Sequence, residues 1–278
     1  MKQLLPLLAL VAIFISCDNG NNPTNTSAVT FKLSQFDQTI TPLNSPAKAP
    51  IYDEEEGGVA LTDIFVFDDT TQVAHQTSDQ EDFGTITISL ANGEHNLSFI
   101  ATRSTNISTA NGVMTMENVR PTFGKLLTLN VTPSTTNQDL TLDRITGKLT
   151  ITILDAFPAD AKEIEFVINP RYSQLDVTTL LATNGQSVAQ KVDCSSKAGK
   201  KDQAFSFNLL APVLDAEYTA DVTINVYNAN NEVIHSVLIN SVRLAANTRT
   251  LLSGEVFRAT GATLNIDHSW NTDLVGSF

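Results

Sequence analysis

The sequence predicts an all-β protein made of two tandem antiparallel β-sandwich domains. Apolar residues alternate with polar ones in short runs along the whole body of the chain. Turn signals such as Asn92-Gly93 and Asn184-Gly185 separate these runs, and helical periodicity is scarce. A period of two places apolar side chains on one face of a strand, and many short strands divided by turns are typical of β-sandwiches.

The first segment, residues 1–16, has the features of an export signal. Lys2 gives a positive start, and an apolar core runs from Leu4 to Ile15. This core is too short to span a bilayer, which needs about 20 apolar residues. Ile15 and Ser16 before Cys17 resemble the end of a bacterial lipoprotein signal, in which Cys17 becomes the acylated first residue of the mature chain. The alternative is ordinary secretion, with Cys17 removed or left as a free thiol.

Residues 17–27 are expected to form a flexible tether after the lipidated cysteine. Asp18 to Ser27 contains Asn, Gly, Pro, Ser and Thr but no apolar residue. Such a segment cannot bury enough surface to offset the entropy lost on ordering. Lipid on Cys17 would then hold the folded part at a membrane, because acyl chains contribute about 0.8 kcal/mol for each buried methylene.

The charge of the chain argues against a nucleic-acid partner, and its cysteine content argues against stabilisation by an intrachain disulfide. The formal net charge is −13, and phosphate backbones are bound by clustered Lys and Arg, so no nucleic-acid partner is expected. Lys197, Lys200 and Lys201 form the one basic cluster, which reads as a solvated loop. Cys194 is the sole cysteine after Cys17, so a lipidated chain has no intrachain disulfide.

The first predicted domain covers residues 28–144. Ile64 to Phe67 is a continuous apolar run, which suits a strand covered on both faces. A polar stretch from Thr132 to Asp139 precedes a closing strand near Leu140 to Leu142. Between these, three alternating strands are predicted: Ile86/Ile88/Leu90, Leu97/Phe99/Ala101 and Leu127/Leu129/Val131.

The second predicted domain covers residues 145–278. Pro158 to Lys162 and Val177 to Ala182 are each long enough for one helical turn, and Asn228 to Asn231 is a turn between strands. The alternating strands expected here are Leu149/Ile151/Ile153, Ile164/Phe166/Ile168, Phe205/Phe207/Leu209, Ala220/Val222/Ile224/Val226 and Leu264/Ile266.

The sequence gives no support for catalysis, a metal centre or a cofactor. No nucleophile elbow, phosphate-binding loop or dinucleotide fingerprint occurs. Asp79 to Asp82 offers oxygen ligands for calcium, but its spacing favours a solvated turn. None of the histidines has a paired metal spacing, and they are His75, His95, His235 and His268.

Three segments of strand and turn residues occur in a distinctive order: Thr62 to Asp68 with the hairpin after it, Gly93 to Ala101, and Leu142 to Leu149 leading to Phe157-Pro158 and Ile164 to Ile168. Together they resemble the fimbrillin-A-associated anchor proteins of Bacteroidetes type V pili. The resemblance implies tandem transthyretin-like sandwiches, lipid attachment at the surface of the outer membrane, and other fimbrial subunits as partners. In this family subunits join by strand addition, in which an extended segment of one fills an open groove of another. The resemblance does not identify any host or bacterial surface ligand.

The positions of the basic residues indicate which role the chain has in a pilus. They favour an anchor, which accepts a neighbouring subunit, and they disfavour a polymerising subunit. Polymerising relatives lose their first strand to a protease, often after arginine, whereas this chain has no arginine between Cys17 and Ala101. Lys32 and Lys48 are the basic residues of that interval, and Arg103 is the first arginine. A stalk or tip subunit of the same pilus is the first alternative. A surface glycan-binding lipoprotein is the second, and it would need an aromatic platform or a calcium site.

Overall fold

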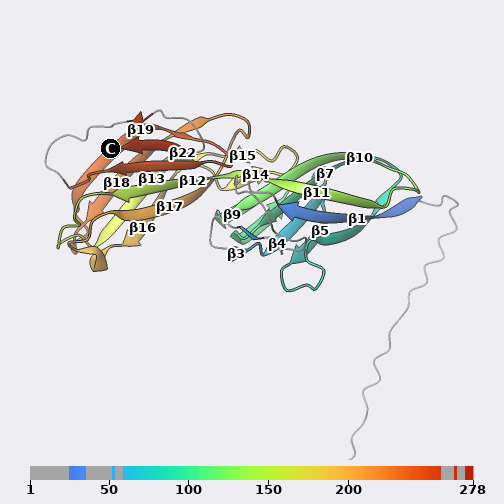
Figure 1. The fold of residues 1–278 in the computed structure, drawn as a ribbon, viewed down its shortest axis with the longest axis horizontal. Coiled ribbons are helices and arrows are strands. Elements are labelled where there is room, and N and C mark those ends of the chain that lie inside the picture. Colours follow the sequence, from blue (N-terminus) through green and yellow to red (C-terminus); the bar gives the residue numbers. More distant parts are fainter. Residues whose placement is uncertain (1–24, 36–51, 54–58, 258–265, 268–272, 278) are drawn as a thin grey trace, which may run out of the picture.

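The computed structural model describes residues 25–35, 52–53, 59–257, 266–267 and 273–277. Within these ranges every regular element is a strand apart from one 3₁₀ turn at Ser195–Lys197, which confirms the all-β prediction. Figure 1 shows the strands gathered in two groups along the long axis, with β9, β14 and β15 where the groups meet. The described residues include no helix that is long and apolar enough to cross a membrane.

A seven-stranded sheet forms the first group, in the order β5-β4-β7-β10-β11-β1-β6. Its strands are β1 (Thr26–Gln35), β4 (Asp63–Asp68), β5 (Thr71–Thr77), β6 (Thr85–Ala91), β7 (Gly93–Thr102), β10 (Thr122–Val131) and β11 (Asn137–Arg144). A separate two-stranded ribbon joins β2 (Tyr52–Asp53) to β3 (Val59–Ala60).

The seven-stranded sheet folds over on itself at the junction of β10 and β11. These two strands pair at only two positions, Phe123 with Arg144 and Gly124 with Asp143. Phe31 of β1 nevertheless lies 4.9 Å from Phe99 of β7, ring centroid to centroid, although β10 and β11 stand between them in the sheet order. Three steps across a flat sheet would place these strands about 14 Å apart. The two ends of the sheet therefore enclose one core.

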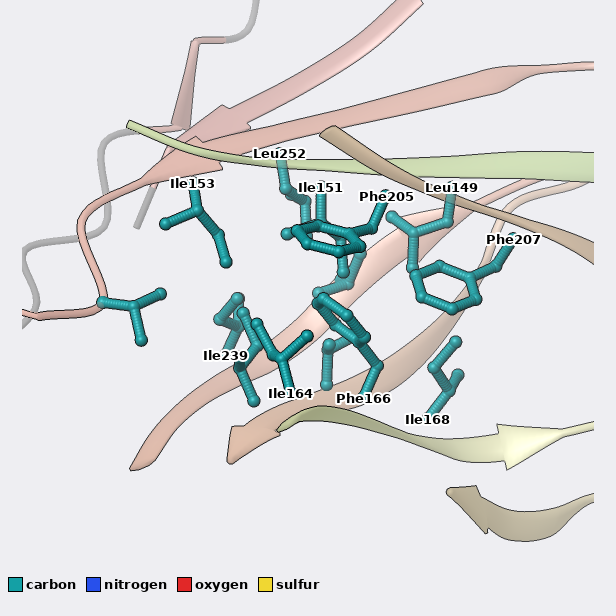
Figure 2. Packing of buried hydrophobic residues seen from close by; sticks show 14 of the residues in the cluster. Leu149, Ile151, Ile153, Ile164, Phe166, Ile168, Phe205, Phe207, Ile239 and Leu252 are labelled. Carbon is teal, nitrogen blue, oxygen red and sulfur yellow. The ribbon is translucent and has the colours of Figure 1, made fainter. Parts of the chain in front are cut away.

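Two sheets that pack face to face form the second group. The first sheet contains β17 (Gln203–Leu210), β12 (Thr146–Ile153), β20 (Arg249–Gly254), β22 (Asp273–Ser277) and β21 (Ile266–Asp267), in that order. The second contains β16 (Gln186–Asp193), β13 (Glu163–Arg171), β18 (Tyr218–Tyr227) and β19 (Val233–Leu244). Figure 2 shows Leu149, Ile151 and Phe205 of the first sheet facing Ile164 and Phe166 of the second.

A small sheet combines strands from the first and second halves of the chain. Its order is β15 (Ala182–Thr183), β14 (Gln174–Asp176), β9 (Val113–Asn118) and β8 (Thr105–Ala110). The antiparallel pair of β9 with β14 places Met114 opposite Leu175. The proposed division into 28–144 and 145–278 is thus crossed by a ladder of backbone hydrogen bonds. A sequence pattern could not show this pairing, because both segments are short and half exposed.

Strand direction differs from the prediction at three pairs. The sheets are not wholly antiparallel, because β1–β11, β12–β20 and β20–β22 run parallel. The first strand of each half has the same surroundings: β1 lies between antiparallel β6 and parallel β11, and β12 lies between antiparallel β17 and parallel β20. Side chains alternate with a period of two in either direction, so the pattern predicted the strands but not their orientation.

Most of the predicted strands and their buried faces are confirmed. Ile86, Ile88 and Leu90 are buried while their neighbours are not, and Ile64 to Phe67 is buried on both faces. In β7 the predicted face of Leu97, Phe99 and Ala101 is buried as expected, but the strict alternation is wrong, because Ser98 and Ile100 are buried as well. Val177 to Ala182 contains a turn but no helix. Leu264 lies outside the described residues, and Ile266 begins β21.

Candidate functional site

The candidate site is the position of the first strand, β1, inside the seven-stranded sheet. Thr26 to Lys32 pairs antiparallel with β6, from Ala91 back to Thr85. Thr30 to Gln35 pairs parallel with β11, from Asn137 to Leu142. The first strand of the described residues is therefore an inner strand of its sheet, with a neighbour on each side.

Alternate side chains of β1 anchor the strand in the core. Val29 and Phe31 are fully buried and Leu33 is 8% exposed, whereas Ala28, Lys32 and Ser34 are exposed. This is the period-two pattern of a strand with one face on a core. Phe31 packs against Phe99, and the same core cluster contains Ile88 of β6.

Polar contacts fix both ends of β1. At its start, the backbone N–H of Asn92 donates to the carbonyl of Asn25 at 2.7 Å, and the Ser27 hydroxyl donates to Asn92 Oδ1 at 3.2 Å. At its end, Leu33 N–H donates to the Gly84 carbonyl at 2.8 Å, and the Ser34 hydroxyl donates to the Leu140 carbonyl at 3.3 Å. The strand is thus tied to the turns at both ends of β6.

His95 contacts the turn between β6 and β7, to which the start of β1 is hydrogen-bonded. Its Nδ1 lies 2.6 Å from Asp68 Oδ2 and its Nε2 lies 2.8 Å from the Ala91 carbonyl oxygen. Both partners are acceptors, so this geometry is satisfied in full only when both ring nitrogens carry protons. Burial lowers the pKa of His95, but the hydrogen bonds to Asp68 and Ala91 and the charges of Asp68 and Asp69 outweigh burial and raise it.

The space that β1 occupies between β6 and β11 is here called the β1 slot. If β1 left, β6 and β11 would each expose a row of unpaired backbone N–H and C=O groups, and the pockets of Val29, Phe31 and Leu33 would open. Such a slot accepts another extended strand, because backbone hydrogen bonds supply affinity and alternate pockets supply specificity. With β1 in place the slot is closed.

The residues that the sequence singled out fall mostly outside this site. Cys17 and His268 lie outside the described residues. His75 stacks on Phe65 at 4.2 Å and contacts Asp63 at 2.9 Å, and His235 meets the edge of Phe257 at 5.2 Å.

The acidic turn and the remaining thiol have local structural partners. Asp79 accepts a short hydrogen bond from the Thr77 hydroxyl, and Cys194 is buried in the core of the second group. In the described ranges, no group of three His, Cys, Asp or Glu side chains is arranged to hold a metal ion.

Sequence reasoning missed the parallel partner of β1 and the role of His95. The pairing of β1 with β11 joins segments about 100 residues apart, which no local pattern reveals. His95 is a strand residue of β7, and its contacts with Asp68 and Ala91 were not predicted. Its position two residues after the Asn92-Gly93 turn, with Asp68 closing an earlier apolar strand, was the available signal.

No protein-family model and no curated protein matches this chain. Solved structures do match, at low sequence identity. A candidate adhesin from Bacteroides ovatus ATCC 8483 superposes with a TM-score of 0.54 and 10% identity, over 77% of this chain and 82% of the other. This likeness shows that the two chains share a fold.

Two further matches have lower scores. The fimbrial anchor protein Mfa2 from Porphyromonas gingivalis gives a TM-score of 0.44 at 11% identity, covering 76% of this chain and 82% of its own. A fimbrial assembly protein from Parabacteroides distasonis ATCC 8503 gives 0.38 at 12% identity, covering 78% and 86%. These two matches come from proteins described as a fimbrial anchor and a fimbrial assembly protein.

Proposed function

We propose that this chain is a lipid-anchored subunit of a type V pilus that holds the base of the fibre in the outer membrane. Lipid on Cys17 would attach it to the membrane, the tether would set its distance from the surface, and the two proposed sandwiches would engage the next subunit. The fold shared with the Bacteroides ovatus candidate adhesin supports a surface protein of this architecture.

Retention of β1 is the feature that favours an anchor over a polymerising subunit. β1 is an inner strand with buried Val29 and Phe31, and the interval from Cys17 to Ala101 contains no arginine at which a protease could release it. Arg103 follows β7, so cleavage there would divide the seven-stranded sheet instead of removing its first strand. A chain that keeps β1 also keeps its covalent link to Cys17.

Because β1 fills its own slot, a strand from a neighbouring subunit could not bind there. The added strand must pair with a sheet edge while β1 remains in place. Among the described strands, β19 is an edge that carries the two most exposed large apolar side chains, Val233 at 52% and Leu238 at 57%. From Val233 to Val242 it has no Asp, Glu, Lys or Arg to oppose pairing, so we propose it as the accepting edge.

The proposal is tested by fractionating cells that carry the native protein and reading the mature N-terminus by mass spectrometry in each fraction. We expect an acylated Cys17 followed by an intact β1, recovered with the membranes. Recovery in sheared fibres with β1 removed would instead identify a stalk or tip subunit. If no fibre accompanies the protein, the glycan-binding alternative is favoured and the pilus assignment is wrong.

A Leu238→Lys substitution tests the accepting edge separately. A charge on an edge strand opposes strand addition, while the exposed position tolerates lysine. We expect the variant to stay folded and membrane-bound but to lose its attached fibre. The matched control is Leu154→Lys, at another exposed leucine (40%) outside β19. Fibres retained on Leu238→Lys would exclude β19 as the accepting edge.

A further inference from the structure

We propose that the two halves of this protein unfold as one cooperative unit, so that stability at the β1 slot is coupled to the packing of the second group of strands. The joint between them is a third core and a shared sheet that neither half completes alone. This inference concerns the folded chain itself and does not depend on the proposed function.

The third core draws side chains from both halves of the chain. Phe65, Phe67 and Ile100 come from the outer face of β4 and β7, and Met114 and Met116 come from β9. The second half of the chain contributes six further buried residues to this core: Ile145, Leu175, Val177, Leu180, Ala182 and Leu210. Met114, Met116 and Val177 are fully buried, so separating the halves would expose a continuous apolar surface to water.

Backbone hydrogen bonds cross the joint at several places. Val177 N–H donates to the Gly112 carbonyl at 2.9 Å, and Met116 N–H donates to the Ser173 carbonyl at 2.8 Å. Thr122 N–H donates to Thr146 Oγ1 at 3.2 Å inside a buried region. An unpaired buried backbone group costs about as much as a lost hydrogen bond, so these groups hold the halves in one relative position.

Close packing at Gly124 of β10 adds a steric constraint. A Cβ atom at this position would lie 2.8 Å from Leu180 Cδ1, which belongs to the second half. Leu180 is 3% exposed and has a positive φ of 56°, so it is held in the tight turn after β14. A methyl group at Gly124 would require the Leu180 side chain to shift, so the two halves are in close contact here.

The joint connects directly to the β1 slot. β11 pairs with β1 along Thr30 to Gln35, ends at Arg144, and continues through Ile145 of the third core into β12 at Thr146. β4 and β7 line the β1 core with one face and the third core with the other. Because the β1 core and the third core share β4 and β7, disorder in one core removes packing contacts from the other. The stabilities of the two cores are therefore coupled in both directions.

A matched pair of substitutions tests this coupling by native-state hydrogen exchange on the full mature chain. Ile88→Val removes one methyl group from the β1 core, and Ile224→Val removes one from the core of the second group. The readouts are the amides of β7 in the first half and of β13 in the second. Substitutions of this kind change the opening equilibrium by between about twofold and about tenfold.

Coupling predicts that each substitution accelerates exchange in both strands by the same factor. If each accelerates exchange only in its own half, the halves unfold independently and the proposal is overturned. Leu175→Ala in the joint should accelerate β7 and β13 together, whereas Leu154→Ala at an exposed position should accelerate neither. A Leu175→Ala effect confined to β13 would likewise contradict the inference.

Discussion

The phenyl ring of Phe31 in β1 packs against that of Phe99 in β7, with centroids 4.9 Å apart and ring planes tilted by 52°. Both side chains are fully buried. Tilted aromatic pairs contribute about 0.5–1.5 kcal/mol beyond the area that they bury. Because the contact spans the two folded ends of the seven-stranded sheet, the first strand is part of the core and not an appendage to it.

Replacement of Phe31 by alanine should therefore destabilise the protein strongly. We expect a loss of about 3–5 kcal/mol in the free energy of unfolding, the range for a buried phenylalanine. Lys32→Ala, one residue along and exposed, should change it by no more than about 0.5 kcal/mol. Urea unfolding measures both, and equal effects would show that β1 contributes little to the core.

Phe166→Asp tests the core of the second group. Phe166 is fully buried, with the rings of Phe205 and Phe207 at 4.9 Å and 5.0 Å (Figure 2). An uncompensated buried charge costs about 3–5 kcal/mol, so we expect the variant to lose its folded structure. Val167→Asp places the same charge on the outer face and should cost about 1 kcal/mol. A folded Phe166→Asp variant by circular dichroism would contradict the assigned face.

The His95 contacts predict a pH-dependent stability. The pKa of His95 is raised in the folded state, so protonation stabilises the fold. Its contribution is complete below the unfolded pKa of about 6.5 and is lost as the pH rises through the folded pKa.

The matching experiment is His95→Gln, followed by denaturant unfolding at pH 6 and pH 9. We expect the substitution to cost about 1.5–3 kcal/mol at pH 6, as for a charged hydrogen bond, and clearly less at pH 9. His75→Gln, at a more exposed histidine, should cost less than about 1 kcal/mol at pH 6. A His95→Gln effect that is the same at both pH values would show that protonation of His95 does not contribute.

Cys17→Ala tests lipid attachment directly. Cys17 precedes the described strands in the sequence, so loss of the proposed lipid should release the protein from the membrane fraction without unfolding it. Asn19→Ala in the same segment keeps the cysteine and should leave the protein membrane-bound. Fractionation followed by circular dichroism measures both properties, and a membrane-bound Cys17→Ala protein would rule out lipid anchoring.

The arginine-free interval predicts resistance to removal of β1. An arginine-specific protease should yield no fragment that ends between Cys17 and Ala101 from the native protein. Lys48→Arg introduces a cleavage site between β1 and β4 in the sequence. Cleavage there should leave β1 held by pairing alone and exchangeable with an added β1 peptide. Mass spectrometry follows the fragments, and release of β1 from the unmodified chain would contradict the anchor assignment.

Local patterns predicted much of this fold because side-chain alternation depends only on the strand itself. Ile164, Phe166 and Ile168 are buried as expected, and the continuous run Ile64 to Phe67 is covered on both faces. β7 shows where this reasoning failed: alternation predicted one buried face, but Ser98 and Ile100 on the other face are buried too, and Ile100 belongs to the core at the joint. A pattern cannot show a surface that a distant segment will cover.

The sequence by itself determined the all-β class, the turns, and the apolar faces of the strands, because these follow from neighbouring residues. It also raised the prediction of lipid at Cys17, which lies outside the described residues. Tertiary structure alone decided that β1 lies between β6 and β11, that His95 meets Asp68 and Ala91, and that β9 pairs with β14. Each of these contacts joins residues that only chain folding brings together, and parallel and antiparallel partners leave the same period in the sequence.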